Sequence, residues 1–283
     1  MVYSAIFSSD NGEKYVFGEN GNTVFDMDFG NGVAVDVRTS QGFAQIGETV
    51  QSRKVSSRRI LVSGVVYGDV YERKTSMRKI FAPFSSGVLK FGNEYYIRVV
   101  ISETPTFSPV KHDGRFVMQF LAAFPFFRRI KESVFSFGDV LPSFKFPINY
   151  SIPHNFGETI FERYVNVFND GDVETYFNVT FQTNSTSVNP TISNLKTFKH
   201  LSINGTINVG DVVSIYRDDK NVLRAELFRD GETTDIISWI DEESTLFSLD
   251  VGDNLIAVND DGGLENLFAK ISFNPAVVAI YEH

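Results

Sequence analysis

Residues 58–100 constrain the fold most, because a strand, a helix and a hairpin follow one another there at short spacing. Residues 59–67 are rich in β-branched side chains and predict a largely buried strand. Residues 88–100 hold two apolar runs around the turn Gly92-Asn93 and predict a β-hairpin. Strands are therefore expected on both sides of the one convincing helical pattern in the chain.

That helical pattern begins at Asp69, a residue type that favours the N-cap, and Glu72 follows at the spacing of a capping box. Pro83 and Gly87 end the pattern. Its apolar face consists of Val70, Met77, Ile80, Phe81 and Phe84. We predict one helix over residues 69–84, packed on a sheet that includes residues 60–67 and 116–124.

The remainder of the chain alternates short apolar runs with turn sequences. From residue 156 onward these runs recur at a spacing that is typical of a β-sandwich. Residues 133–154 contain three prolines, which fix φ and remove backbone donors, so we expect an extended linker there. The sequence thus predicts a mainly β protein with domains at 1–132 and 155–283, and with the helix in the first domain.

A polar segment, residues 41–57, separates predicted strands and is a candidate extended loop or arm. This segment contains one basic pair and is directly followed by another, and four further cations lie on the predicted helix. The eight residues are Arg53, Lys54, Arg58, Arg59, Arg73, Lys74, Arg78 and Lys79. A solvated loop and helix face would explain this cluster. The alternative is a contact surface for an acidic neighbour, such as the acidic half of another copy.

The net charge of −9 is unevenly divided. Residues 1–132 hold 17 Lys and Arg against 13 Asp and Glu, while residues 133–283 hold 9 against 22. The balances of +4 and −13 support two separately built halves. The acidic half argues against general nucleic-acid binding, because phosphate contacts need clustered cations.

Several protein classes are disfavoured by what the sequence lacks. Cysteine is absent, which excludes a disulfide scaffold and a thiolate metal site. No apolar run approaches the length of about 18 residues that spans a bilayer, so no membrane partner is expected. The first residues show neither a basic region nor a long apolar core, so no signal peptide is expected.

Residues that commonly catalyse reactions or bind cofactors form no convincing motif. The histidines are His112, His154, His200 and His283, and none has a second ligand at metal-binding spacing. Gly30-Asn31-Gly32 lacks the third glycine and the helix of a dinucleotide site. Asn169-Asp170-Gly171-Asp172 and Asn259-Asp260-Asp261 could bind calcium, but such runs are standard turn sequences. We predict no enzyme, no metal and no cofactor.

The order of these segments resembles the distal tail protein family, the siphovirus-type tail components of phages of Gram-positive bacteria. In the first half the matching segments are Arg59-Ile60-Leu61-Val62-Ser63-Gly64, Phe81-Ala82-Pro83, Gly87-Val88-Leu89-Lys90-Phe91, Tyr95-Tyr96-Ile97-Arg98-Val99 and Phe120-Leu121-Ala122-Ala123-Phe124-Pro125-Phe126-Phe127. In the second half they are Asn169-Asp170-Gly171-Asp172, Asn189-Pro190, Val209-Gly210-Asp211-Val212-Val213-Ser214-Ile215 and Phe247-Ser248-Leu249-Asp250-Val251-Gly252-Asp253-Asn254. Each motif is weak alone, and their order makes the resemblance specific.

The resemblance implies an N-terminal domain that forms a homohexameric ring and a C-terminal galectin-like β-sandwich. It implies a structural hub at the distal end of the virion tail, with DNA passing through a channel without specific binding. The implied partners are the tail tube protein, a tail-associated tip protein, and baseplate or receptor-binding proteins. A ring needs head-to-tail contacts between unlike surfaces, which a basic-leaning half and an acidic half can supply.

Two other functions stay open, a carbohydrate-binding host-recognition protein and, more weakly, a glycan-degrading tail enzyme. Sugar-binding sandwiches commonly present an exposed aromatic platform. The single Trp239 lies in Ile236-Ile237-Ser238-Trp239-Ile240, which predicts a strand with apolar residues on both faces. We therefore predict that Trp239 is packed, which favours the hub, while Tyr216 and Tyr281 could still offer a platform.

Overall fold

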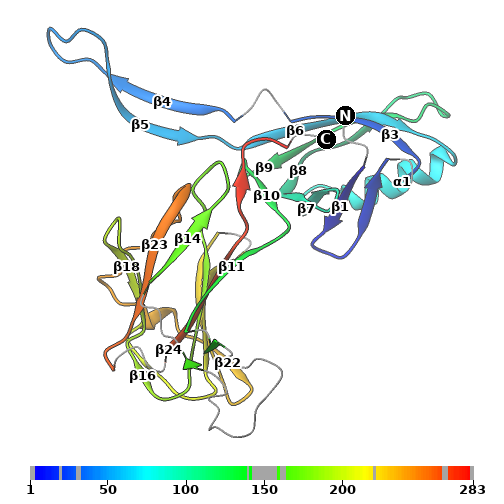
Figure 1. The fold of residues 1–283 in the computed structure, drawn as a ribbon. Coiled ribbons are helices and arrows are strands. Elements are labelled where there is room, and N and C mark those ends of the chain that lie inside the picture. The colour runs from blue at the N-terminus through cyan, green and yellow to red at the C-terminus, as the bar shows by residue number, and fades with distance from the viewer. Residues whose placement is uncertain are drawn as a thin grey trace, which may run out of the picture. The chain divides into compact units, whose positions relative to one another are not determined.

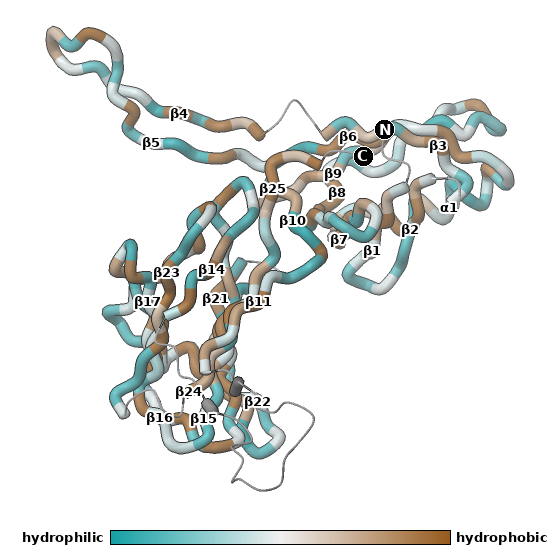
Figure 2. The backbone as a smooth tube through the Cα atoms, in the orientation of Figure 1, coloured by the Kyte–Doolittle hydropathy of each residue, from teal (hydrophilic) through white to brown (hydrophobic). Residues whose placement is uncertain are grey.

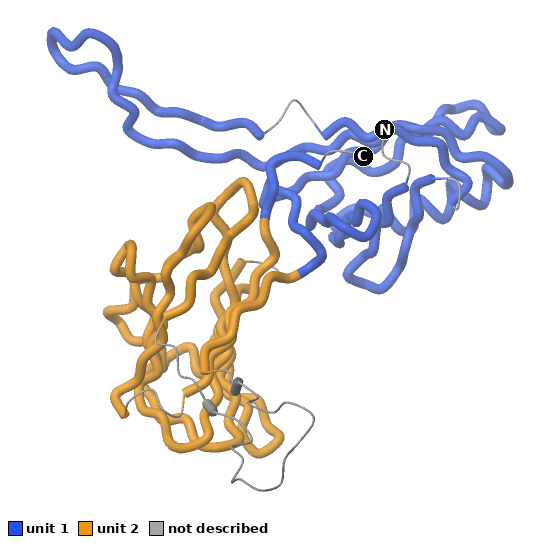
Figure 3. The backbone as a smooth tube through the Cα atoms, viewed as in Figure 1, with its two compact units in different colours: residues 1–131, 276–283 blue, residues 132–275 orange. Residues whose placement is uncertain are grey.

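The computed structural model describes residues 4–18, 21–29, 33–138, 140–141, 158–159, 164–218, 221–262 and 267–280. The chain forms two compact units (Figure 3): unit 1 comprises residues 1–131 and 276–283, and unit 2 comprises residues 132–275. Strands dominate both units, and the described residues contain one α-helix, as predicted. No helix in these ranges is long and apolar enough to cross a membrane.

Unit 1 is organised around a nine-stranded sheet whose main path runs β2-β1-β7-β8-β9-β6-β3, with β10 joined to β8 and β25 (Figure 1). Its strands are β1 (Ala5–Ser9), β2 (Lys14–Phe17), β3 (Thr23–Asp28), β6 (Arg58–Val66), β7 (Ser86–Phe91), β8 (Tyr95–Phe107), β9 (Arg115–Ala122), β10 (Phe127–Arg129) and β25 (Ala276–Val277). Between β3 and β6 a separate two-stranded hairpin is formed by β4 (Val35–Ser40) and β5 (Thr49–Val55). The predicted hairpin at 88–100 is present as β7 and β8.

The prediction that residues 59–67 are largely buried is wrong in one respect. Along β6, Ile60 and Val62 are fully buried, whereas Leu61 and Val65 are about two-fifths exposed, at 38% and 40%. Successive residues of a strand point to opposite sides of the sheet. β6 is therefore covered on one side only, and its second side stays open.

The helix, α1 (Val70–Ile80), covers the closed side of the sheet. The Asp69 side chain accepts a hydrogen bond from the Glu72 N–H at 3.0 Å, so the predicted N-cap is correct. Met77 and Phe81 are fully buried, but the helix ends earlier than predicted. Phe84 lies beyond that end, at φ +69° and 99% exposed, and does not belong to the apolar helix face.

Phenylalanine rings fill the core of unit 1. The Phe81 ring centroid lies 5.1 Å from that of Phe7, 5.7 Å from Phe17 and 5.9 Å from Phe120. These separations fall within the favourable range for aromatic pairs. The helix is therefore fixed to β1, β2 and β9 through one central side chain.

Unit 1 is completed by the last described part of the chain. β25 pairs with β10, and Nη2 of Arg58 donates to the Val278 carbonyl at 2.7 Å. The Arg58 guanidinium also stands 4.8 Å from the centroid of the Phe127 ring. Burial lowers the pKa of Arg58 because it removes water from the charged group.

Unit 2 contains a six-stranded sheet and a four-stranded sheet, and one hydrophobic core includes residues of both. In the order β11-β24-β15-β20-β21-β22, the first sheet contains β11 (Ser133–Phe137), β15 (Asn178–Thr183), β20 (Val212–Arg217), β21 (Leu223–Arg229), β22 (Glu232–Asp235) and β24 (Leu267–Phe273). The second, in the order β14-β23-β17-β18, contains β14 (Tyr164–Asn169), β17 (Thr191–Asn194), β18 (Lys199–Ser202) and β23 (Gly252–Asn259). Short pairs join β12 (Val140–Leu141) to β13 (Glu158–Thr159) and β16 (Ser187–Val188) to β19 (Thr206–Ile207).

The unit boundaries differ from the predicted domains at two places. The first residues of the predicted linker form β11, which pairs with β24 and so belongs to the sheet of unit 2. Residues 276–283 were predicted in the second domain but belong to unit 1, because β25 pairs with β10 there. The rest of the predicted linker, residues 142–154, lies outside the described residues.

Trp239 is packed, as predicted, but not on a strand. It ends a short 3₁₀ helix, η2 (Ile237–Trp239), and its ring packs against the core of unit 2. A Cβ atom added to Gly205 would come within 2.4 Å of that ring. The ring therefore lies directly on the backbone at Gly205, and only a glycine fits beneath it.

Candidate functional site

The β4–β5 hairpin, residues 35–55, is here called the arm. Its two strands pair only with each other and not with the main sheet of unit 1. Every residue in both strands is exposed. Figure 1 shows the arm extending away from the sheet, and the Ser56 N–H continues the pairing with a 2.9 Å bond to the Ala34 carbonyl. An isolated two-stranded hairpin is only marginally stable in water. Such an arm is expected to lie against another molecule.

The two faces of the arm differ in polarity. Cross-strand partners share a face, and one face joins Val35 to Val55, Val37 to Arg53 and Thr39 to Val50. Its four valines, Val35, Val37, Val50 and Val55, are 45–51% exposed and form what we call the valine face. The opposite face joins Asp36 to Lys54, Arg38 to Ser52 and Ser40 to Thr49. Apolar residues follow both strands of the arm in Figure 2.

The tip of the arm is an ordered turn that presents two apolar side chains. The Gln45 side chain accepts from the Gly42 N–H at 2.9 Å and donates to the Thr49 hydroxyl at 2.9 Å. Phe43 and Ile46 are fully exposed on this frame. Large apolar side chains held on rigid, exposed elements are typical anchors of protein interfaces.

A second group of exposed apolar side chains lies on the open side of the unit 1 sheet, where polar and charged residues alternate with them. We call it the outer patch: Val24, Leu61, Val65 and Val117, which are 38–65% exposed on three adjacent strands. An open depression of about 570 Å³ includes Val65 and Val117 in its lining. Exposed Asp26 lies within the patch, since it pairs with Ser63, which pairs in turn with Val117.

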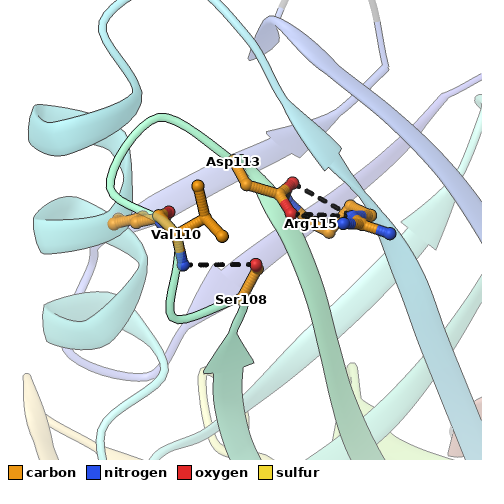
Figure 4. A network of polar contacts seen from close by, with 5 residues as sticks. Ser108, Val110, Asp113 and Arg115 are labelled. Atoms are coloured by element: carbon orange, nitrogen blue, oxygen red, sulfur yellow. Dashed lines mark hydrogen bonds and ion pairs between the residues drawn. The ribbon is translucent and has the colours of Figure 1, made fainter.

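The loop between β8 and β9 places the ion pair of Asp113 and Arg115 at the rim of this depression (Figure 4). Asp113 accepts hydrogen bonds from the Arg115 side chain at 2.8 Å and from its N–H at 3.1 Å. These bonds hold the pKa of Asp113 well below its usual range and raise that of Arg115. Ser108 accepts from the Val110 N–H at 3.4 Å. The cation at the rim thus has its counter-ion two residues away.

The structure divides the eight cations of the predicted contact surface. Arg58 and Lys74 are buried, at 4% and 9% exposure, and therefore are not part of an exposed surface. Lys74 donates to the Val110 carbonyl at 3.4 Å, and Arg73 donates to the Gly21 carbonyl at 2.7 Å. Arg58, Arg73 and Lys74 therefore stabilise unit 1 itself. Each donates to a backbone carbonyl, and the aliphatic part of such a side chain can pack on apolar groups.

The other five cations are exposed but do not form one surface. Arg53 lies on the valine face and Lys54 on the opposite face of the arm. Arg59 follows Arg58 on β6. The Arg78 guanidinium stands 5.1 Å from the Phe107 ring, and Lys79 pairs with Glu13 at 2.9 Å. The sequence groups these residues because they are close along the chain. In the structure they lie on different elements, and neighbouring residues of a strand point to opposite faces.

Within the described ranges, no group of three or more His, Asp or Glu side chains is arranged to hold a metal ion. Asn169 instead stabilises a turn: its amide donates to the Val173 and Leu249 carbonyls at 3.0 and 3.2 Å. Asp260 accepts from the Ser187 hydroxyl at 2.6 Å. His154 and His283 lie outside the described residues.

Residues 170–276 match the family model described as the siphovirus-type tail component, C-terminal domain. The resemblance to the distal tail protein family is confirmed. The matched residues comprise most of unit 2, so the family match rests on the sandwich and not on the arm. A comparison with curated proteins gives no match.

Solved structures extend the likeness to unit 1. The SPP1 Dit protein, described as a paradigm of the hub adsorption apparatus in phages that infect Gram-positive bacteria, has a TM-score of 0.67 at 11% identity. That comparison covers 95% of this chain and 98% of the other. A chain of the phage P2 baseplate in its activated conformation with calcium has a TM-score of 0.51 at 13% identity, with 95% and 97% covered. The strontium form gives 0.50 at 14% identity, with the same coverage. At these identities the likeness concerns the fold.

Sequence reasoning missed the valine face, the tip and the outer patch. The signal for the valine face was present, since valines alternate at positions 35 and 37 and recur at 50 and 55. The outer patch was hidden because β6 has apolar residues on both faces. Phe43 and Ile46 were hidden in a segment that is polar on average.

Proposed function

We propose that this protein is a structural, non-catalytic component of a phage tail, positioned in the virion at the distal end of the tail. The observation that supports this most is the family match over residues 170–276, together with a fold shared with the SPP1 Dit protein over 95% of the chain. Unit 2 would be the galectin-like sandwich of such a protein, and unit 1 its ring-forming domain.

In this proposal six copies form a ring that joins the tail tube to tip, baseplate or receptor-binding proteins. The central channel lets DNA pass without specific contacts. Exposed apolar surfaces on the arm and on the open side of the unit 1 sheet are what an assembling subunit requires, because monomeric proteins rarely leave such patches uncovered. A ring follows when two unlike surfaces of one chain meet between copies and the rotation closes.

The test is a mass measurement of the full chain combined with negative-stain imaging, alone and with the tail tube protein. We expect a ring of six copies, which dissociates on dilution if it depends on its neighbours. Closed two-fold dimers as the sole assembly, with no ring even beside tail tube protein, would contradict the hub.

The alternative of a carbohydrate-binding protein loses its best candidate residue. Trp239 is half-buried, and part of its ring lies on Gly205, so it is not the fully exposed platform that a sugar site commonly presents. Tyr281 lies outside the described residues, and Tyr216 donates its hydroxyl to Glu226 at 2.8 Å. Trp239 is the only tryptophan, so its fluorescence in the full chain is a clean reporter. A saturable change with host cell-wall polysaccharide, abolished by Tyr216→Ala in a folded protein, would favour the lectin.

A further inference from the structure

We propose that unit 2 binds a neutral polysaccharide on the side of its four-stranded sheet that faces away from the core. Tyr164 and Phe168 stack on sugar rings, and Asn166 and Asp253 bind hydroxyl groups. We call this surface the aromatic face. Its function is additional to the proposed hub and does not require the ring. The surface is distinct from Tyr216, which lies on the six-stranded sheet.

The first reason is the exposure of two aromatic rings on one strand. Tyr164 is 58% exposed and Phe168 is 51% exposed. Both lie on β14 with Asn166 between them, while Val167 is fully buried in the core. Alternation along the strand therefore places the other three side chains on the outer side of the sheet. Rings held on a strand offer a ligand a large rigid surface at a low cost in conformational entropy.

The second reason is a hydrogen-bonding pair beside the two rings. The Asn166 amide donates to the Asp253 carboxylate at 2.6 Å, and Asp253 is the cross-strand partner of Phe168. A carboxylate has about four lone-pair sites and an amide oxygen about two, so both side chains can still accept from hydroxyl groups. Ligand sites commonly combine an aromatic surface with a few polar groups. Sugars match this combination, because each sugar ring has apolar faces and a rim of hydroxyl groups.

The third reason is spacing, which sets the size of the ligand. Residues four apart along a strand are separated by about 13 Å. A single sugar ring cannot contact both Tyr164 and Phe168 across that distance, whereas a chain of several sugar units can. Leu255 and Ala257, both half-buried, lie beside the rings on the neighbouring strand β23. The aromatic face therefore suits an oligosaccharide or a polysaccharide and not a monosaccharide.

Charge determines the class of polysaccharide. Residues 133–283 hold 9 Lys and Arg against 22 Asp and Glu, and exposed Asp253 lies on the aromatic face itself. Polymers that carry phosphate groups are therefore repelled, because binding them needs clustered cations. A protein that covered the face would have to bury the Asp253 carboxylate, which is costly unless a cation pairs with it. A neutral polysaccharide leaves this carboxylate hydrated or hydrogen-bonded to hydroxyl groups.

Calorimetric titration of the full-length protein tests the site. The probe is a series of neutral oligosaccharides of increasing length, cut from purified cell-wall polysaccharide of Gram-positive bacteria. We expect the affinity to rise with length and to level off once a chain spans both rings. Tyr164→Ala and Phe168→Ala should each raise Kd about tenfold. Both sites are exposed, so both variants should melt like wild type.

Two further variants separate stacking from a general effect on unit 2. Phe168→Tyr keeps an aromatic ring and should bind nearly as well as wild type. The matched control is Tyr176→Ala, because Tyr176 is 44% exposed in the same unit but lies outside the aromatic face, with the Arg217 guanidinium 4.1 Å from its ring centroid. Tyr176→Ala should bind the oligosaccharides like wild type.

Three outcomes would overturn the inference. Loss of binding in Tyr216→Ala but not in Tyr164→Ala moves the site to the six-stranded sheet. Tighter binding of a phosphate-bearing wall polymer than of any neutral oligosaccharide contradicts the class of ligand. Absence of binding by the wild type removes the site and leaves the proposed hub intact, since the hub is tested separately by the mass measurement and the imaging.

Discussion

Two of the hairpins in unit 1, β7–β8 and the arm, have sequences that alternate in similar ways but have different surroundings. In the β7–β8 hairpin the inward residues Leu89, Ile97 and Val99 are buried against the aromatic core. In the arm the corresponding valines meet solvent. An alternating pattern therefore predicts that one face of a ribbon is covered, but not whether the cover comes from the same chain. The pair of hairpins provides matched sites for testing this.

The largest effect is expected when the same charge is introduced into each hairpin. Leu89→Asp places an unpaired carboxylate in a fully buried site and should lower the free energy of unfolding by about 4 kcal/mol or more, which unfolds unit 1. Val37→Asp should change it by less than about 0.5 kcal/mol, because the site is open. Thermal melting of both full-length variants measures the contrast. Equal destabilisation would mean that the arm is covered within its own chain.

A similar contrast in stability is expected between Phe81, which is buried at the end of the helix, and Phe84, which is exposed three residues later. Phe81→Asp should unfold unit 1, since the Phe81 ring contacts four other rings of the core. Met77→Asp should do the same. Phe84→Asp should leave the melting temperature within a few degrees of wild type, because the ring is exposed. Unchanged melting of Met77→Asp or Phe81→Asp would refute the packing of α1.

An intermediate effect is expected at the neighbouring cations of β6. Arg58→Ala removes a buried donor from the Val278 carbonyl and should cost about 2–3 kcal/mol. Arg59→Ala, at the exposed position next to it, should cost less than about 0.5 kcal/mol. Chemical denaturation gives both values, and hydrogen exchange should show faster exchange at residues 276–280 in Arg58→Ala. Matching losses for the two would contradict a special role of Arg58.

The smallest effect concerns an ion pair of unit 2, which differs from the exposed cations of the arm. Arg229 donates to the carboxylate of Asp211, and this lowers the pKa of Asp211. The folded unit then binds fewer protons than the unfolded chain, so this contribution is complete at neutral pH and is lost as pH falls below about 4. Asp211→Asn should melt lower at neutral pH and lose less stability in acid. Parallel curves for the two proteins would argue against the pair.

Much of the fold could be predicted from local rules. The N-cap at Asp69, the turn at Gly92-Asn93 and the apolar helix face follow from interactions between residues that are close in sequence. What failed depends on distant contacts. β25 belongs to unit 1 because of β10, nearly 150 residues earlier in the chain, and β11 belongs to a sheet because of β24. Trp239 lies in a 3₁₀ helix, and its ring packs on the backbone of Gly205, a contact that local sequence does not reveal.

The candidate site was predicted in part. The polar segment 41–57 was recognised as a possible arm, and the structure places an exposed hairpin there. The predicted contact residues mixed buried and exposed cations, because sequence spacing does not reveal which face of a strand a residue occupies until its register is known. Arg53 and Lys54 are adjacent in sequence and lie on opposite faces of the arm.

The central claim is that this chain is an assembling subunit whose arm is covered in the assembly, and hydrogen–deuterium exchange on dilute and assembled protein tests it most directly. We expect amides of residues 35–55 to exchange rapidly in the dilute chain and to gain strong protection on assembly, as the assembly shields the hairpin. Amides of residues 86–100 should be protected equally in both states and serve as the internal reference. An assembled ring in which residues 35–55 exchange as fast as in the dilute chain would contradict the claim.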